Sequence, residues 1–245
     1  MARLISLLYG IAAYLLFFVV FLYSIGFVGN WLVPKSIDSG SEGSLVPSLL
    51  VNFILLGVFA VQHSVMARPG FKRWWTRMVP EAIERSTYVL LSSLALALLF
   101  WQWQPLPDVV WDVKNPAGAL VLCGLFWAGW LIALTSTFMI NHFDLFGLRQ
   151  VYLNLRGEKY TNVNFKILGL YKLARHPIML GFVIAFWATP HMTVGHLLFA
   201  VATTAYIVIA LQLEERDLVA SIGDDYMQYK KQVSMLLPLP RGKKD

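Results

Sequence analysis

The segment YKLARHPIMLGF, residues 171–182, places three basic side chains directly before an apolar run. Lys172, Arg175 and His176 precede Pro177, a residue that suits the first position of a helix. The N–H groups and the dipole at a helix start favour an anionic group, so this segment is a candidate anion-binding site. Anchoring in anionic lipid is the alternative for Lys172 and Arg175. A neutral His176 is a poor lipid anchor.

A second cluster lies in LQLEERDLVASIGDDYMQYKKQV, residues 211–233. Glu214 and Glu215 arrive at the end of an apolar run, where two carboxylates oppose the negative end of the helix dipole. We therefore expect a cationic group to compensate them. Apolar and aromatic residues recur at helical spacing through this stretch, which predicts a surface amphipathic helix, or two helices separated near Gly223. A plain surface helix with solvated charges is the alternative.

A third cluster, NHFDLFGLRQ, follows the longest central apolar run. His142 and Asp144 lie two residues apart, and Arg149 follows. A carboxylate beside an imidazole orients it and raises its pKa, so this pair is a candidate general base. An interfacial histidine and a capping aspartate are the alternative. For His63, in QHSVMARPGFK, we favour a packing role.

The elements that position these clusters are mostly membrane spans. Hydrophobic residues make up 58% of the 245 and charged residues 14%, against about 25% charged in soluble domains. Runs of about 20 apolar residues predict spanning helices, and five runs qualify: 4–29, 47–67, 86–104, 117–140 and 193–213. A shorter run, 177–190, forms a hairpin with its successor.

The sequence thus predicts an all-α, polytopic integral membrane protein with five to six transmembrane helices, including a C-terminal helical hairpin, followed by a cytoplasmic amphipathic helix. We expect four N-terminal spans in residues 1–140 and a cofactor-binding region in residues 141–245. Small residues in the fourth span predict a close helix contact there: Gly118, Gly124, Ala128 and Gly129.

The basic residues predict the orientation of these spans. Of the 20 Lys and Arg residues, all but Lys35 and Lys114 fall on the side of the N-terminus. The positive-inside rule then predicts that the termini and the large basic loops are cytoplasmic. The net charge of +6 is therefore a topology signal, and we predict no nucleic-acid partner, no protein partner and no metal site. The single Cys123 excludes an internal disulfide framework.

Together these clusters resemble the C-terminal signature of the integral-membrane methyltransferases, a group that includes isoprenylcysteine carboxyl methyltransferase and bacterial phospholipid N-methyltransferases. The resemblance covers about residues 165–240, ends near Pro238 and departs from the group at Met179, where relatives often have tyrosine. It implies S-adenosylmethionine binding by these residues: Tyr171, Arg175, His176, Pro177, Gly181, Glu214, Glu215, Tyr226 and Tyr229. No strand followed by G-x-G is present in the sequence, so a Rossmann-type cofactor site is not predicted.

Segments of the N-terminal two-thirds, such as ERSTYVLLSS and NHFDLFGLRQVYL, are similar to the bacterial methanethiol S-methyltransferases. That resemblance implies methyl transfer to a small thiol, methanethiol, giving dimethyl sulfide. Thiols are mostly protonated near neutrality, so a base is needed. We assign this role to His142 oriented by Asp144, with Arg149 stabilising the thiolate or binding cofactor.

Two other functions stay open at this point. A lipid or isoprenylated acceptor is the alternative within methyltransferases. A haem-binding membrane protein of nitrogen-oxide metabolism is the alternative from another class, because His63, His142 and His176 are all predicted at the inner face, where two could be axial ligands.

Overall fold

The computed structural model describes residues 1–40, 43–163 and 165–237. The chain divides into two compact units that interleave along the sequence. The first unit comprises Met1–Asp108, His142–Val163 and Thr193–His196, and the second comprises Val109–Asn141, Asn164–Met192 and Leu197–Asp245. The expected division at residue 140, into spans and a cofactor-binding region, is a functional one and stays a prediction.

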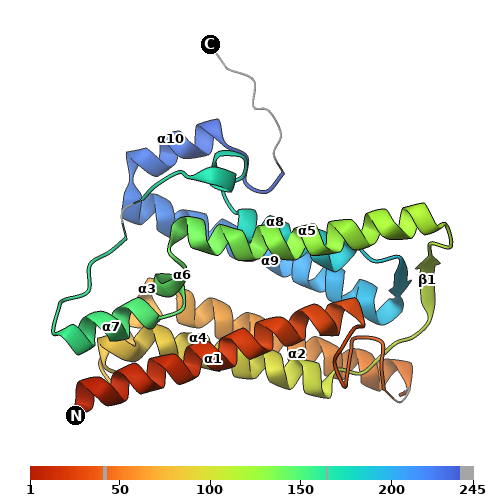
Figure 1. The fold of residues 1–245 in the computed structure, drawn as a ribbon, viewed down its shortest axis with the longest axis horizontal. Helices are drawn as coiled ribbons and strands as arrows, with labels where there is room; N and C mark the ends of the chain where they lie inside the picture. The colour runs from red at the N-terminus through yellow and green to blue at the C-terminus, as the bar shows by residue number, and fades with distance from the viewer. Residues whose placement is uncertain (41–42, 164, 238–245) are drawn as a thin grey trace. The chain divides into compact units, whose positions relative to one another are not determined.

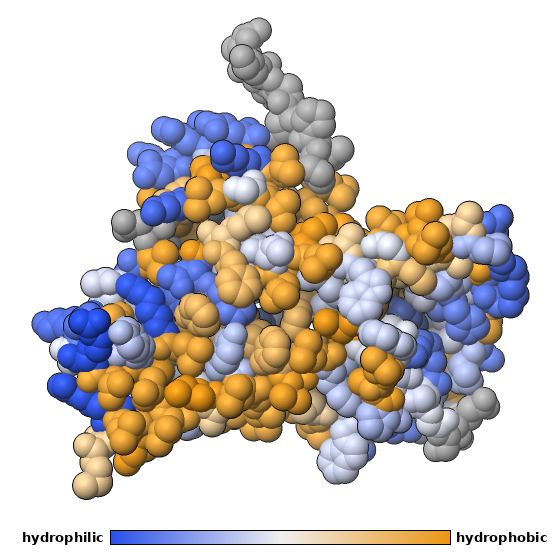
Figure 2. Space-filling view, in the orientation of Figure 1, coloured by the Kyte–Doolittle hydropathy of each residue, from blue (hydrophilic) through white to orange (hydrophobic). Residues whose placement is uncertain are grey.

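The first unit is built on three long apolar helices, which Figure 1 draws side by side. They are α1 (Ala2–Gly29), α2 (Leu45–Ala67) and α4 (Glu81–Gln102). Three short helices accompany them: α3 (Pro69–Trp75), α6 (His142–Leu145) and α7 (Leu148–Arg156). Large apolar side chains of α1, such as Leu15 and Phe18, are exposed, and the surface over this helix is largely hydrophobic in Figure 2. Such a surface suits lipid.

The second unit pairs α5 with α8 and adds the C-terminal helices. Its elements are β1 (Val109–Asp112), α5 (Pro116–Ile140), the 3₁₀ helix η1 (Gly169–Lys172), α8 (Pro177–Trp187), β2 (His191–Thr193), α9 (Val194–Ile222) and α10 (Asp224–Gln232). Thr193, the last residue of β2, and residues 194–196, at the start of α9, belong to the first unit. The all-α prediction is confirmed, except that β1 and β2 form a small two-stranded sheet that the sequence did not indicate.

Five described helices are long and apolar enough to cross a membrane: α1, α2, α4, α5 and α9. The chain is therefore a multi-pass membrane protein, as predicted. Helix α8 has 11 residues, which corresponds to about 16 Å at 1.5 Å per residue, or about half of a bilayer core. The short run at 177–190 therefore does not cross as helix alone.

The chain around α8 nevertheless runs the length of α5. Before α8, the Tyr171 hydroxyl lies 3.4 Å from the carbonyl oxygen of Ser136, in the last turns of α5. After α8, the carbonyl oxygen of Pro190 accepts a hydrogen bond of 2.8 Å from the N–H of Val113, just before α5 begins. Residues 171–190 thus lie along much of the length of α5.

Close packing between α5 and α8 depends on glycine. A Cβ on Gly129 would lie 2.6 Å from the carbonyl oxygen of Gly181 and 2.7 Å from the backbone nitrogen of Ala185. Gly129 therefore confirms the predicted small-residue contact. Gly124, on the same helix, has no atom within 4 Å of the corresponding position, so the small residues of α5 do not all serve packing.

The C-terminal part of the chain forms two helices, as one of the two sequence interpretations proposed. Helix α9 continues through Glu214 and Glu215 to Ile222. Gly223 then takes a φ of +75°, a conformation that favours glycine, and α10 begins. The prediction that the Glu pair lies at a helix end is wrong, because α9 extends about two turns beyond it.

Candidate functional site

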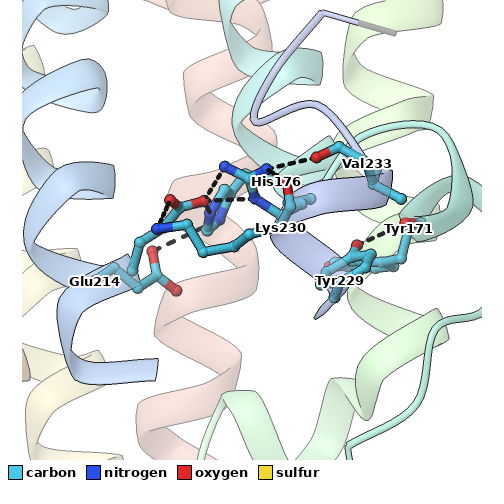
Figure 3. A network of polar contacts seen from close by, with 8 residues as sticks. Tyr171, His176, Glu214, Tyr229, Lys230 and Val233 are labelled. Carbon is cyan, nitrogen blue, oxygen red and sulfur yellow. Dashed lines mark hydrogen bonds and ion pairs between the residues drawn. The ribbon is translucent and has the colours of Figure 1, made fainter. Parts of the chain in front are cut away.

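A buried ion pair between α8 and α9 forms the centre of the predicted cofactor site (Figure 3). Arg175 immediately precedes the α8 N-cap, and its Nε and Nη2 atoms each lie 2.6 Å from Oε1 of Glu215. The two side chains are only 4% and 8% exposed. A buried charge is tolerated when it is paired and hydrogen-bonded, so each of these residues needs the other.

Two further groups with basic nitrogens surround Glu215. His176 places Nε2 3.3 Å from Oε1, and Lys230 of α10 places Nζ 3.0 Å from Oε2. Glu214 has a side chain that is 47% exposed, and its Oε2 lies 3.9 Å from Nδ1 of His176. The predicted cationic compensation of the Glu pair is thereby confirmed.

Sequence reasoning missed Lys230. It lies four residues after Tyr226, and residues at this spacing share a helix face. The sequence feature that could have indicated Lys230 was therefore its position on the same face of α10 as Tyr226.

The backbone after α10 fixes the segment that carries Arg175. Ala174 and Ser234 form a parallel bridge, and the N–H of Arg175 donates to the carbonyl oxygen of Ser234 at 2.9 Å. The Arg175 guanidinium also donates to the carbonyl oxygen of Val233. These contacts hold the guanidinium in place from both its backbone and its side chain.

Three predicted tyrosines surround the ion pair. The Tyr229 hydroxyl donates to the backbone oxygen of Tyr171 at 2.5 Å. Burial raises the pKa of Tyr229 to about 12, so its hydroxyl remains a donor at neutral pH. Burial likewise raises the pKa of Tyr226, whose oxygen is buried and has no hydrogen-bond partner within the described residues. An orphaned buried hydroxyl is costly and indicates a site for a missing polar partner.

Pro177 and Gly181 complete the predicted cofactor set. Pro177 occupies the first turn of α8, as expected. At Gly181 the close neighbour is helix α5, because a Cβ there would lie 2.5 Å from the carbonyl oxygen of Gly129. The observed reason for this glycine is helix packing, and its contact with cofactor stays a prediction. Pro238, where the resemblance ends, lies outside the described residues.

The predicted catalytic residues belong to the first unit. His142 is 4% exposed, and its Nε2 lies 2.8 Å from the hydroxyl of Tyr14 in α1. Phe143 and Phe146 pack edge-on or tilted against its ring. The expectation of a raised pKa is wrong: burial in this aromatic setting lowers the pKa of His142.

Asp144 and Arg149 form part of a structured loop. Arg149 donates to Asp144 at 2.9 Å and to the backbone oxygen of Thr161 at 2.7 Å. The Tyr160 hydroxyl donates to the other oxygen of Asp144 at 3.2 Å. These contacts fasten the chain after α7, so both residues have a structural role, and their catalytic role stays a prediction.

The three histidines suggested as haem ligands are each engaged within the protein. Both ring nitrogens of His63 lie within 3.0 Å of the Tyr88 hydroxyl, and the ring stacks on Phe59, which fits the favoured packing role. His142 and His176 contact Tyr14 and Glu215 through Nε2.

Comparison with known proteins identifies the family. The family described as NnrU protein matches residues 51–232, which is more than half of the chain. The chain therefore belongs to the NnrU family. No solved structure matches it.

Its relatives include named enzymes. Methanethiol S-methyltransferase of Mycobacterium tuberculosis is 62% identical over 98% of each chain, and the protein of that name from Crocosphaera subtropica is 53% identical over 97% of this chain and 93% of its own. Nurim of Mus musculus is 31% identical over 72% of this chain and 70% of its own. These similarities support the resemblance to membrane methyltransferases.

Proposed function

We propose that this protein is an S-adenosylmethionine-dependent methyltransferase that converts methanethiol to dimethyl sulfide. The observation that carries the proposal is the 62% identity, over 98% of both chains, to a protein named methanethiol S-methyltransferase. Similarity over the whole length of both chains supports a shared activity more strongly than a shared fold does, because the residues of every element are compared.

The residues around Glu215 fit the proposed methyl donor. When bound, S-adenosylmethionine supplies a methyl group on a positively charged sulfur. The half-exposed Glu214 carboxylate and the Oε2 side of Glu215 suit its cationic groups. The orphaned Tyr226 hydroxyl can satisfy a polar atom of the ligand. Arg175 is held by Glu215 and the backbone, so its main role is to fix that carboxylate.

In this mechanism His142 accepts the proton of the thiol. Because burial lowers its pKa below the usual 6.5, the imidazole is neutral at pH 7 and competent to accept a proton. The Tyr14 hydroxyl, 2.8 Å away, holds the ring in one orientation. Once His142 holds its proton, the thiol sulfur would be the nucleophile for the methyl group that a bound donor would supply.

We also propose that the termini and the large basic loops lie in the cytoplasm of a bacterial cell, where the methyl donor is made. The distribution of Lys and Arg supports this orientation. A small apolar thiol and a volatile product can both cross the bilayer, which suits a membrane enzyme.

The test is product analysis with purified protein in detergent or nanodiscs. Methanethiol and S-adenosylmethionine should yield dimethyl sulfide in the headspace, measured by gas chromatography, and a heat-denatured sample should yield none. Methylated lipid in place of dimethyl sulfide would establish the lipid acceptor as substrate. A haem absorption band in the purified protein, without methyl transfer, would favour the haem-binding alternative.

A further inference from the structure

The two oxygens of the Glu215 carboxylate have different environments. Oε1 lies 2.6 Å from both Nε and Nη2 of Arg175 and 3.3 Å from Nε2 of His176, and these side chains are at most 8% exposed. Oε2 lies 3.0 Å from Nζ of Lys230, whose side chain is 34% exposed. Figure 3 shows the side chain of Lys230 extending into the network of polar contacts. Oε1 is thus held by buried side chains, whereas Oε2 is paired with a lysine ammonium that can move into solvent.

Lys230 can leave without releasing α10. The helix and the segment after it are also held by the Tyr229 hydroxyl on Tyr171 and by Arg175 on the Val233 carbonyl oxygen. A lysine ammonium is a point charge on a flexible side chain, whereas the planar guanidinium of Arg175 is fixed by several hydrogen bonds. The exchangeable cation at this carboxylate is therefore Lys230.

A missing polar partner is indicated on the face of α10 that carries Lys230, because Tyr226 lies four residues before it. Tyr226 is 2% exposed, and its hydroxyl has no hydrogen-bond partner within the part of the chain that the structure describes. Glu215 and Arg175 are among the charges that act on this hydroxyl. A cationic group of a ligand that bound Glu215 at Oε2 would have to share this oxygen with the Lys230 ammonium, and the two positive charges repel each other. Such a ligand and Lys230 therefore compete for Oε2.

We propose that Lys230 occupies, in the ligand-free chain, the position on Glu215 that the sulfonium group of the methyl donor takes, and that it is displaced on binding. This inference rests on the proposed function and names Lys230 as a specificity-determining residue. The displacement favours a ligand that replaces the lost positive charge. The sulfonium donor replaces it better than the thioether that remains after methyl transfer, so Lys230 helps to expel the product.

The first test is calorimetric binding of S-adenosylmethionine and S-adenosylhomocysteine to the intact protein. Lys230→Gln removes the competing cation, so the donor should bind about two- to fivefold more tightly, the range of a partly exposed ion pair, and the thioether should gain less. Lys231→Gln, an exposed neighbour on α10, and the charge-conserving Lys230→Arg should leave the affinities at or below those of the wild type.

The second test follows the lysine itself in the wild-type protein. Acetylation by an amine-reactive reagent, read by mass spectrometry, should be faster at Lys230 when S-adenosylmethionine is present, with Lys231 as the internal reference. Weaker donor binding by Lys230→Gln, or unchanged or slower acetylation of Lys230, would overturn the proposal. Absence of binding by any variant, wild type included, would instead overturn the proposed function.

Discussion

Gly181 tests whether a residue of the predicted cofactor set serves the ligand or the fold. A Cβ at this position would lie 2.5 Å from the carbonyl oxygen of Gly129 and 2.6 Å from the backbone nitrogen of Ala133. Ordinary contacts begin at 3.4 Å, so α5 and α8 must separate by about 1 Å to accept Gly181→Ala. Backbone atoms cannot rotate away as a flexible side chain can.

The cost follows from two opposing effects. Overpacking of this kind costs about 1–3 kcal/mol, while alanine gains about 0.4–1 kcal/mol over glycine because it restricts the unfolded chain. We expect a net loss of about 1–2 kcal/mol, equivalent to a fall in Tm of about 2–8 °C for a chain of this size. Gly124→Ala is the matched control, because no atom lies within 4 Å of its Cβ position, and its Tm should be unchanged or slightly higher.

The assay is thermal unfolding in one detergent, combined with binding of S-adenosylmethionine at a temperature where both variants are folded. Gly129→Ala should lose a similar amount of stability, and the double variant should lose less than the sum, because one separation of the helices accommodates both methyl groups. If Gly181→Ala melts like Gly124→Ala yet no longer binds the donor, the packing argument is refuted and the glycine serves the ligand.

Three further predictions concern the ionisable groups. Glu215→Ala should destabilise the protein by about 3–5 kcal/mol in chemical unfolding, because it leaves Arg175 buried without its partner; equal stability would refute the structural role of the pair. Glu214→Gln should weaken donor binding in calorimetry and leave Tm unchanged, since this side chain is 47% exposed; a large fall in Tm would contradict this assignment. The stability that neutral His142 contributes is complete above about pH 6.5 and is lost as the pH falls through its lowered pKa. His142→Gln should therefore flatten the fall in Tm on acidification below pH 6.5, and an unchanged profile would exclude His142 as its source.

The spans and the nearness of the two charged segments could be predicted because each depends on a simple pattern. Long apolar runs determine the spanning helices, and the predicted ranges differ from α1, α2 and α5 by a few residues at most. A hairpin that begins after Arg175 and returns to the Glu pair brings the two charged segments together, so their nearness follows from topology, whereas the direct ion pair of Arg175 with Glu215 was not predicted.

Other features depend on tertiary contacts that no local pattern encodes. The sequence marks Gly181 as a close-approach position but does not say whether a ligand or a helix approaches. His142 has an acidic residue two positions away, yet its burial in an aromatic cluster lowers its pKa. The bridge between Ala174 and Ser234 joins segments sixty residues apart, and nothing in either segment indicates it.

The Glu214-Glu215 pair shows how helix geometry separates two identical neighbours. Successive residues on an α-helix point about 100° apart, so one carboxylate of α9 faces the protein interior and the next is half-exposed. The Glu215 carboxylate neutralises the buried Arg175 guanidinium. Glu214 contacts no arginine or lysine among the described ion pairs. A ligand that approaches with one positive charge can therefore be held by Glu214 without loss of the ion pair that orders the site. If Lys230 is displaced as proposed, the same charge reaches Glu215 only when the lysine leaves, and this favours a sulfonium over the uncharged sulfur that remains after methyl transfer.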